Sequence, residues 1–233
     1  MTKAASSASQ TEAPLTDGPI TRAWRPELDP GALPETPDLT AGQRRVVRAC
    51  LLHFATRGYG GSNLRDIAAT LDINAGSVYK HFPSKEAILA ELVVIGTDYH
   101  RAVTLAAAMS AGSDPADQFV AWMNAHLRVH CEYSRLPVVI HHEWQNLSPE
   151  SLAAAEQRIQ QSAFPLREIL DRGKRLGRFR FAELEPVLIA VTGLGMTAAH
   201  WFPYQSDFTL DEVCGQFLTL ALGMCGADQP SAS

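Results

Sequence analysis

The sequence predicts an all-α fold of about nine helices, arranged as a small N-terminal unit and a larger C-terminal one. Apolar residues recur with the three-to-four-residue spacing of helices, and no run alternates convincingly as a strand. Capping residues, prolines and glycines divide these periodic stretches into separate helices. With 46% hydrophobic residues, the chain has enough apolar side chain to bury a core.

Charge is distributed unevenly along the chain. The total is −5, but residues 1–39 carry −3, residues 40–97 carry +3 and residues 98–233 carry −5. A compact basic segment in an otherwise acidic chain favours contact with nucleic-acid phosphates through that segment alone.

Cysteine usage and hydropathy exclude several classes of protein. Cys50, Cys131, Cys214 and Cys225 are too scattered for a zinc knuckle or a redox pair, and each lies in an apolar helical context. No signal peptide precedes the core, and no apolar run reaches the ~18 residues of a membrane span. We therefore expect a soluble cytoplasmic protein with reduced thiols and no membrane partner.

The first predicted helix begins after Thr40, whose spacing to Gln43 fits a capping box, and it stops at Gly58. Before it, residues 1–39 contain six prolines and no sustained apolar period, which predicts a flexible N-terminal arm. An arm that contacts DNA is the alternative, and the acidic balance of this segment argues against it.

Two short helices with a tight turn between them follow. Asn63 is placed to cap the first, residues 72–74 form the break, and residues 75–81 form the second. Pro83 ends that helix, and Ser84 caps a long one. Two short helices joined by a tight turn and braced on both sides predict a helix-turn-helix over residues 63–82.

About five further helices are expected in the remainder. Gly112 to Pro115 separates two of them, Pro137 begins another, and Ser148 before Pro149 is a helix start. A long apolar helix opens at residues 185–186 and closes at Pro203. Thr209 and Glu212 make a second capping box before the last helix, which runs to about residue 226.

The second short helix has an unusual composition for a helix that only packs. Apart from Val78, residues 75–81 offer small side chains and then a phenol, an ammonium and an imidazole. Ala75, Gly76 and Ser77 would let the backbone lie close to base edges. The polar residues after them, Tyr79, Lys80 and His81, can donate to phosphates or bases.

These residues resemble the N-terminal domain of the TetR family of transcriptional regulators. The resemblance covers about residues 40–92, and its strongest part is the pattern of Tyr79, His81, Phe82 and Lys85 behind an Arg-Asp-Ile-Ala helix at residues 65–68. It implies phosphate contacts for Asn63, Tyr79, His81 and Lys85, and base contacts for Ala75, Ser77 and Lys80. Phe82 is expected in the core, between the recognition helix and the long helix.

One turn position departs from the family pattern. Asp72 stands where the family often has glycine. Because aspartate tolerates the left-handed region better than most residues, we expect the turn to survive at a small cost.

The resemblance also implies that residues 98–226 bind a small molecule and dimerise. In the last two helices, Gly193, Thr197, Ala198 and Ala221 would permit the close approach that a four-helix dimer interface requires, although small residues also occur in ordinary cores. Two-fold symmetry would then present two recognition helices to a palindromic operator.

Aromatic and histidine side chains in this region suggest a hydrophobic effector site. The candidate ligand-binding residues are Trp122, Met123, His126, His130, His142, Glu143, Phe164 and Trp201. Ordinary core packing is the alternative for each of them. A metal site would require His126 and His130 to converge with the histidines at 141–142 and with Glu143; we expect satisfied or surface histidines, and no metal or other cofactor.

The C-terminal half is also loosely similar to a TetR subgroup that responds to acyl-CoA thioesters in lipid and steroid catabolism. Arg172, Lys174, Arg175 and Arg178 form a basic cluster that could hold the phosphates of coenzyme A. A solvated helix end, favoured by the helix dipole, is the alternative.

The sequence thus predicts a one-component, homodimeric transcriptional repressor. It would bind double-stranded operator DNA, and a small hydrophobic effector, with an acyl-CoA thioester as the candidate, would release it. An enzyme is not expected, because no nucleophile, base and orienting group have recognisable spacing. The alternatives are an effector-independent DNA-binding or architectural protein, and a TetR-type sensor of aromatic drugs or natural products.

Overall fold

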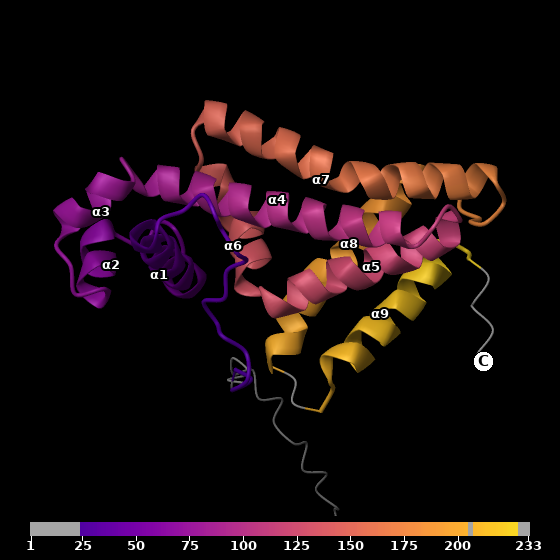
Figure 1. Cartoon of the computed structure of the whole chain (residues 1–233), viewed down its shortest axis with the longest axis horizontal. Coiled ribbons are helices and arrows are strands. Elements are labelled where there is room, and N and C mark those ends of the chain that lie inside the picture. Colours follow the sequence, from indigo (N-terminus) through magenta and orange to yellow (C-terminus); the bar gives the residue numbers. More distant parts are fainter. Residues whose placement is uncertain (1–23, 205–206, 228–233) are drawn as a thin grey trace, which may run out of the picture.

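The computed structural model describes residues 24–204 and 207–227, and this part of the chain is helical with no strand (Figure 1). Its α-helices are α1 (Ala41–Arg57), α2 (Leu64–Thr70), α3 (Ala75–His81), α4 (Lys85–Ser110), α5 (Pro115–Glu132), α6 (Arg135–Glu143), α7 (Pro149–Arg175), α8 (Leu184–Trp201) and α9 (Leu210–Met224). Two 3-10 helices, η1 (Trp144–Asn146) and η2 (Phe202–Tyr204), complete it. The all-α prediction of about nine helices is confirmed.

Helix ends follow the side-chain chemistry predicted from the sequence. Capping boxes form at Thr40 with Gln43 and at Thr209 with Glu212. The side chains of Asn63 and Ser84 accept backbone N–H groups at the starts of α2 and α4. Each cap satisfies donors that the first helical turn leaves unpaired.

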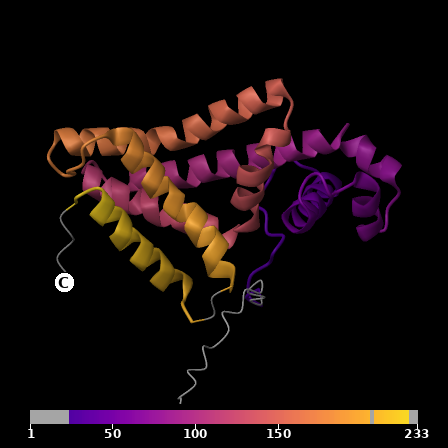
Figure 2. The same ribbon diagram turned by 180° about the vertical axis from the view of Figure 1, so that it is seen from behind.

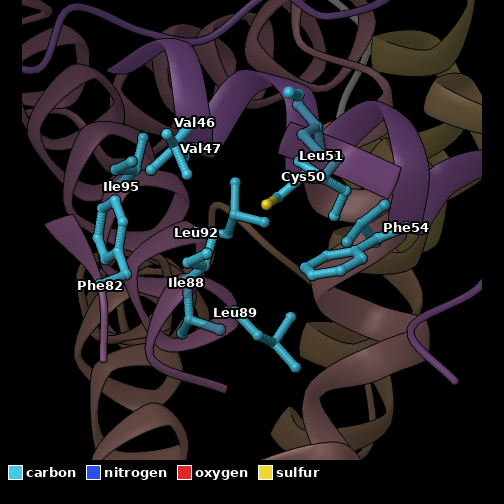
Figure 3. Close-up of a cluster of buried hydrophobic side chains, with 14 of the residues drawn as sticks. Val46, Val47, Cys50, Leu51, Phe54, Phe82, Ile88, Leu89, Leu92 and Ile95 are labelled. Carbon is cyan, nitrogen blue, oxygen red and sulfur yellow. The ribbon is translucent and has the colours of Figure 1, made fainter. Parts of the chain in front are cut away.

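The first hydrophobic core lies between α1, α2, α3 and the beginning of α4, at one end of the molecule (Figures 1 and 3). Val47, Leu51 and Ile88 are fully buried there. Phe82 is only 6% exposed and packs into this cluster, as predicted.

Helix α6 belongs to this first core, although its sequence position lies within the segment 98–226. Leu136, Val139 and Ile140 pack into the same cluster as the side chains of α1 and α4. The second core surrounds α5, which packs against α4, α7, α8 and α9 (Figures 1 and 2). Within the described residues, no helix is long and apolar enough to cross a membrane.

All four cysteines are free and buried in these two cores. Burial raises the pKa of Cys50 and of Cys225 to about 12, and that of Cys214 to about 11. The pKa of the Cys131 thiol is raised for the same reason. Because the thiolate is the reactive form, these thiols behave as small apolar side chains.

Residues 24–39 differ from the flexible arm that the sequence predicts. Leu33 is 8% exposed within the first core, and Arg44 of α1 donates to the carbonyls of Leu33 and Pro34 at 2.9 and 2.7 Å. At the other end of the segment, the Arg25 N–H donates to the Pro203 carbonyl at 2.8 Å. The prolines keep the segment from forming a helix, but its carbonyls and leucine side chain still bind the helical body. Residues 1–23 lie outside the described part.

Candidate DNA-binding surface and ligand cavity

The break between α2 and α3 is a tight turn at Asp72, the one described non-glycine residue with positive φ, at 55°. The turn therefore survives with aspartate, as predicted. Asn74 then begins α3 by accepting the backbone N–H of Ser77 at 2.8 Å. This local geometry sets the direction in which α3 leaves the turn.

One side of α3 is anchored and the other is open. Val78 is fully buried against the first core, whereas Tyr79 is 54% exposed and Lys80 is exposed beside it. Gly76 and His81 are also exposed, and Ala75 and Ser77 are half-buried. Helix α3 is therefore held chiefly through Val78, with Ala75 packed beside it and the His81 ring near Gly42 of α1. Tyr79 and Lys80 face outward, which is the arrangement a recognition helix needs.

The structure gives Lys85 a role other than the phosphate contact inferred from the resemblance. Its ammonium donates to the carbonyls of Tyr59 and Ser62 at 2.6 and 2.8 Å and lies 3.9 Å from the centroid of the Tyr59 ring. Lys85 thus fastens the loop before α2 to the start of α4. Since its charge is already paired with two carbonyls, we expect stability rather than DNA affinity to depend on it.

Asn63 is likewise occupied within the chain. Its Oδ1 accepts the Asp66 N–H at 2.8 Å, and its amide donates to the Asp66 carboxylate at 2.7 Å. A capping residue of this kind positions α2, and any phosphate contact would have to displace one of these bonds.

A cavity of about 440 Å³ lies between α4, α5, α6, α7 and α8. Its lining is mostly apolar and includes no Asp, Glu, Lys or Arg. The exposed residues Ile159 of α7 and Ile189 of α8 are part of the lining, so the cavity opens to the surface between these two helices. A cavity of this size and composition suits a small apolar ligand.

Three of the eight candidate ligand-binding residues line this cavity: Trp122, His126 and His130. The others face elsewhere because neighbouring helical positions differ by about 100° in direction. Met123 is fully buried in the second core, and Phe164 is 57% exposed on the outside of α7. His142, Glu143 and Trp201 are also absent from the lining. The Trp201 ring packs against that of Phe208 instead, with centroids 5.4 Å apart.

Sequence reasoning missed the contribution of α4. Gly96, Thr97, Tyr99 and His100 line the cavity from this helix. Small and polar residues that interrupt the apolar face of α4 were the available signal.

His100, His126 and His130 form a polar cluster in the cavity wall. His100 Nε2 lies 2.7 Å from His126 Nδ1, and the ring centroids of His126 and His130 are 4.2 Å apart. Burial lowers the pKa of His100 to about 3, that of His130 to about 4 and that of His126 well below its usual value. All three imidazoles are therefore neutral at pH 7.

The basic cluster predicted for coenzyme A phosphates does not reach the cavity. None of Arg172, Lys174, Arg175 and Arg178 lines it. Each of these side chains, at or just after the end of α7, has a hydrogen-bond or ion-pair partner instead. The partners are Gln118 for Arg172, the Ala182 carbonyl for Lys174, Asp171 for Arg175 and Asp114 for Arg178. The solvated, ion-paired helix end is the interpretation that this geometry supports.

The four residues proposed for dimerisation divide into two pairs. Gly193 and Thr197 are exposed on α8, whereas Ala198 and Ala221 are fully buried between helices of the same chain. The exposed face of α8 and α9 is nonetheless apolar, with Ile189, Leu220 and Met224 at 69%, 54% and 41% exposure. Exposed apolar surface of this extent is typical of an interaction site.

Two family models match this chain. Residues 49–92 match the family model of bacterial regulatory proteins of the tetR family, and residues 112–225 match the tetracyclin repressor-like C-terminal domain. The chain belongs to the TetR family, whose members are DNA-binding transcriptional regulators and not enzymes.

Individual proteins of this family resemble the chain over most of its length. The chain is 27% identical over 198 residues to the HTH-type transcriptional repressor KstR2 of Mycobacterium tuberculosis, covering 80% of this chain and 96% of that protein. A solved tetR-family regulatory protein from Rhodococcus RHA1 superposes with a TM-score of 0.76 at 27% identity, covering 82% of this chain and all of the other. AibR, solved in complex with isovaleryl coenzyme A and operator DNA, shares the fold with a TM-score of 0.70 at 19% identity, over 77% and 97% of the two chains.

Proposed function

We propose that the protein is a homodimeric repressor that binds a palindromic operator through α3 and is released when a small hydrophobic effector enters the cavity. The observation that carries this proposal is the position of the cavity, because its walls include α4 and α6, which also pack against the DNA-binding helices. Tyr79, Lys80 and His81 would contact the DNA, together with the backbone at Gly76 and the half-buried Ala75 and Ser77.

Helix α6 supplies the connection between effector and DNA. Leu136 and Ile140 belong both to the cavity lining and to the core cluster that includes α1. On α4, a methyl group added at Gly96 would lie 2.5 Å from Ile140 Cδ1, so α4 and α6 are in close contact. An occupant that shifts α6 must therefore move α4 or α1, and with them the recognition helix.

The exposed apolar face of α8 and α9 supports the dimer. Gly193, Gly215 and Gly223 have open space where a Cβ would stand, and a second copy could approach closely there. The same α8 face carries Ile189 and Gly193 of the cavity lining, so the mouth of the cavity lies beside the proposed interface.

The effector we propose is a compact apolar molecule, and an acyl-CoA thioester is the first candidate. AibR was solved in complex with isovaleryl coenzyme A, and KstR2 of Mycobacterium tuberculosis was solved as a ketosteroid transcriptional regulator. In this chain the cavity would take the acyl or ring portion. Since no cationic side chain lines it, the coenzyme A portion would extend through the mouth between α7 and α8.

Mobility-shift titrations with the protein's own promoter region test the repressor role. A palindromic fragment is retained at low salt, and adding acyl-CoAs, free fatty acids, steroid acids or coenzyme A alone shows which chemistry releases it. The variant Ala163→Phe would fill the cavity and block release, whereas Ala154→Phe, at an exposed position of the same helix, would leave release unchanged. Retention of no fragment at low salt would contradict the proposal.

The two alternatives give different outcomes in a thermal-shift screen. A true ligand raises the melting temperature by mass action, so an effector-independent protein responds to none of the compounds. A sensor of aromatic drugs or natural products responds to those compounds and not to acyl thioesters.

A further inference from the structure

We propose that His100, His126 and His130 form a site for a divalent transition metal, Zn²⁺ in the first instance, with its fourth position open to the cavity. The three side chains converge from α4 and α5, and their candidate ligand atoms all lie within 4.8 Å of one another. Tetrahedral ligation at about 2.1 Å from the metal needs ligand nitrogens roughly 3.4 Å apart, which small ring rotations would reach. No other group of this kind occurs in the described residues.

In each ring, the nitrogen that would not bind the metal lies within hydrogen-bond distance of an oxygen atom. His126 Nε2 lies 3.1 Å from the Thr192 carbonyl, and His130 Nδ1 lies 2.8 Å from the His126 carbonyl. A carbonyl oxygen only accepts hydrogen bonds, so each of these two nitrogens carries a proton. The lone pairs of His126 Nδ1 and His130 Nε2 are then available to a metal between the three rings. Outer hydrogen bonds to carbonyls are what orient the histidine ligands of known metal sites.

His100 reaches the same arrangement by a change of tautomer. Its Nδ1 lies 2.6 Å from Ser162 Oγ and its Nε2 lies 2.7 Å from His126 Nδ1. Without metal, His100 Nε2–H donates to His126 and the Ser162 hydroxyl donates to His100. When metal binds, the His100 proton moves to its Nδ1, which then donates to Ser162 Oγ. The lone pairs of His100 Nε2 and His126 Nδ1 become available to the metal, and no net proton is released.

The chain fixes the position of the central ring. A Cβ at residue 195 would lie 2.2 Å from His126 Nε2, so only glycine leaves room for the ring on that side. On the other side Trp122 stacks on His126 with ring centroids 4.8 Å apart. Ligands held in place before binding lose less entropy when the metal arrives.

The charge of the surroundings defines the fourth ligand. Since the imidazoles are neutral and no charged side chain lines the cavity, a bound dication would favour an anionic partner such as a carboxylate or hydroxide. If the cavity is the effector site proposed above, an acyl or ring portion that carries a carboxylate at its buried end could fill this fourth position. That second step rests on the proposed function, whereas the metal site does not.

Titration with metal alone tests the site. Full-length protein stripped with a chelator and dialysed is titrated with ZnCl₂ by calorimetry and with CoCl₂ by visible absorption, in the absence of effector and DNA. We expect one equivalent per chain and the absorption bands of tetrahedral Co²⁺. His100→Gln and His130→Gln should each weaken binding by about 100-fold or more, and Ser162→Ala by about 10-fold, while Ser162→Thr restores it.

Matched controls separate this site from surface binding. His142 and His200 are exposed with ring centroids 5.5 Å apart, so the double variant His142→Gln/His200→Gln removes the competing exposed pair and should leave the affinity unchanged. Operator binding by each variant in chelator shows that it is folded. The proposal is overturned if wild-type protein gives no heat and no Co²⁺ bands, if the His100 and His130 variants bind as tightly as wild type, or if the surface double variant abolishes binding. A failed effector screen would leave these results intact.

Discussion

The DNA-binding end and the cavity region use polar side chains in opposite ways. On α3, Tyr79 and Lys80 face solvent while Val78, with Ala75 beside it, packs the helix against the first core. In the cavity, His126 and His130 are buried. His126 Nδ1 lies 2.7 Å from His100 Nε2, and His130 Nδ1 donates to the His126 carbonyl at 2.8 Å. Polar groups on α3 can therefore change without affecting the fold, whereas those around the cavity are part of the structure.

The largest expected effect concerns the core that supports the cavity. Phe119 is fully buried with its ring 5.4 Å from that of Phe179, whereas Phe164 is 57% exposed. Phe119→Ala should lower the free energy of unfolding by about 3–5 kcal/mol, and Phe164→Ala by less than about 0.5 kcal/mol. Urea unfolding of the two variants measures the difference; equal losses would show that the second core does not carry the stability of this region.

Two lysines at the DNA-binding end are expected to differ in their effects on stability and on operator binding. Lys85→Ala should cost about 1–3 kcal/mol of stability, because the carbonyls of Tyr59 and Ser62 lose a charged donor. Lys80→Ala should leave stability within about 0.5 kcal/mol but weaken operator binding and alter sequence preference. Chemical denaturation and mobility shifts on both variants check this. If Lys85→Ala kept full stability and only reduced the salt dependence of binding, the phosphate contact inferred from the resemblance would be restored.

These contrasts also show which parts of the molecule could be predicted from the sequence. The helix-turn-helix was predictable because its determinants are local: Asn63 and Ser84 cap the helices that follow them, and Asp72 makes the turn within the same few residues. The cavity was predictable only in part, because His100 lies 26 residues from His126 along the chain and they meet only through packing of α4 on α5. The environment of the basic cluster was predictable only in part, because two of its partners, Gln118 for Arg172 and Asp114 for Arg178, are distant in sequence.

Acid should destabilise the fold through the buried histidines of the cavity. The folded pKa values of His100 and His130, about 3 and about 4, lie below the ordinary value, so the unfolded chain takes up protons first as pH falls. The contribution of these imidazoles to the free energy of unfolding is therefore fully present above about pH 6.5. It falls as the pH drops toward their folded-state pKa values, by up to about 1.4 kcal/mol per pH unit for each imidazole. In chelator, His100→Gln should lose about 1 kcal/mol less than wild type between pH 7.5 and pH 5.5. A wild-type curve for His100→Gln would contradict the expected coupling.

The smallest effect is expected in the turn. Asp72 holds φ at 55°, where glycine is unstrained, so Asp72→Gly should raise the free energy of unfolding by about 0.5–1 kcal/mol. Asp72→Val should lower it by more than about 1 kcal/mol, because a branched side chain is least tolerated there. Thermal unfolding of both variants would show the opposite signs; a loss with glycine would mean that the aspartate side chain itself stabilises the turn.

The buried cysteines have a practical consequence for measuring motion. Since all four native thiols are enclosed and their pKa values are raised, a single cysteine introduced on the exposed surface, as in Lys80→Cys, would be the one that reacts readily with a spin label or fluorophore. In a dimer, two such labels would report the separation of the two recognition helices directly. The distance change on adding an effector could then be followed in solution without removing any native residue from the core.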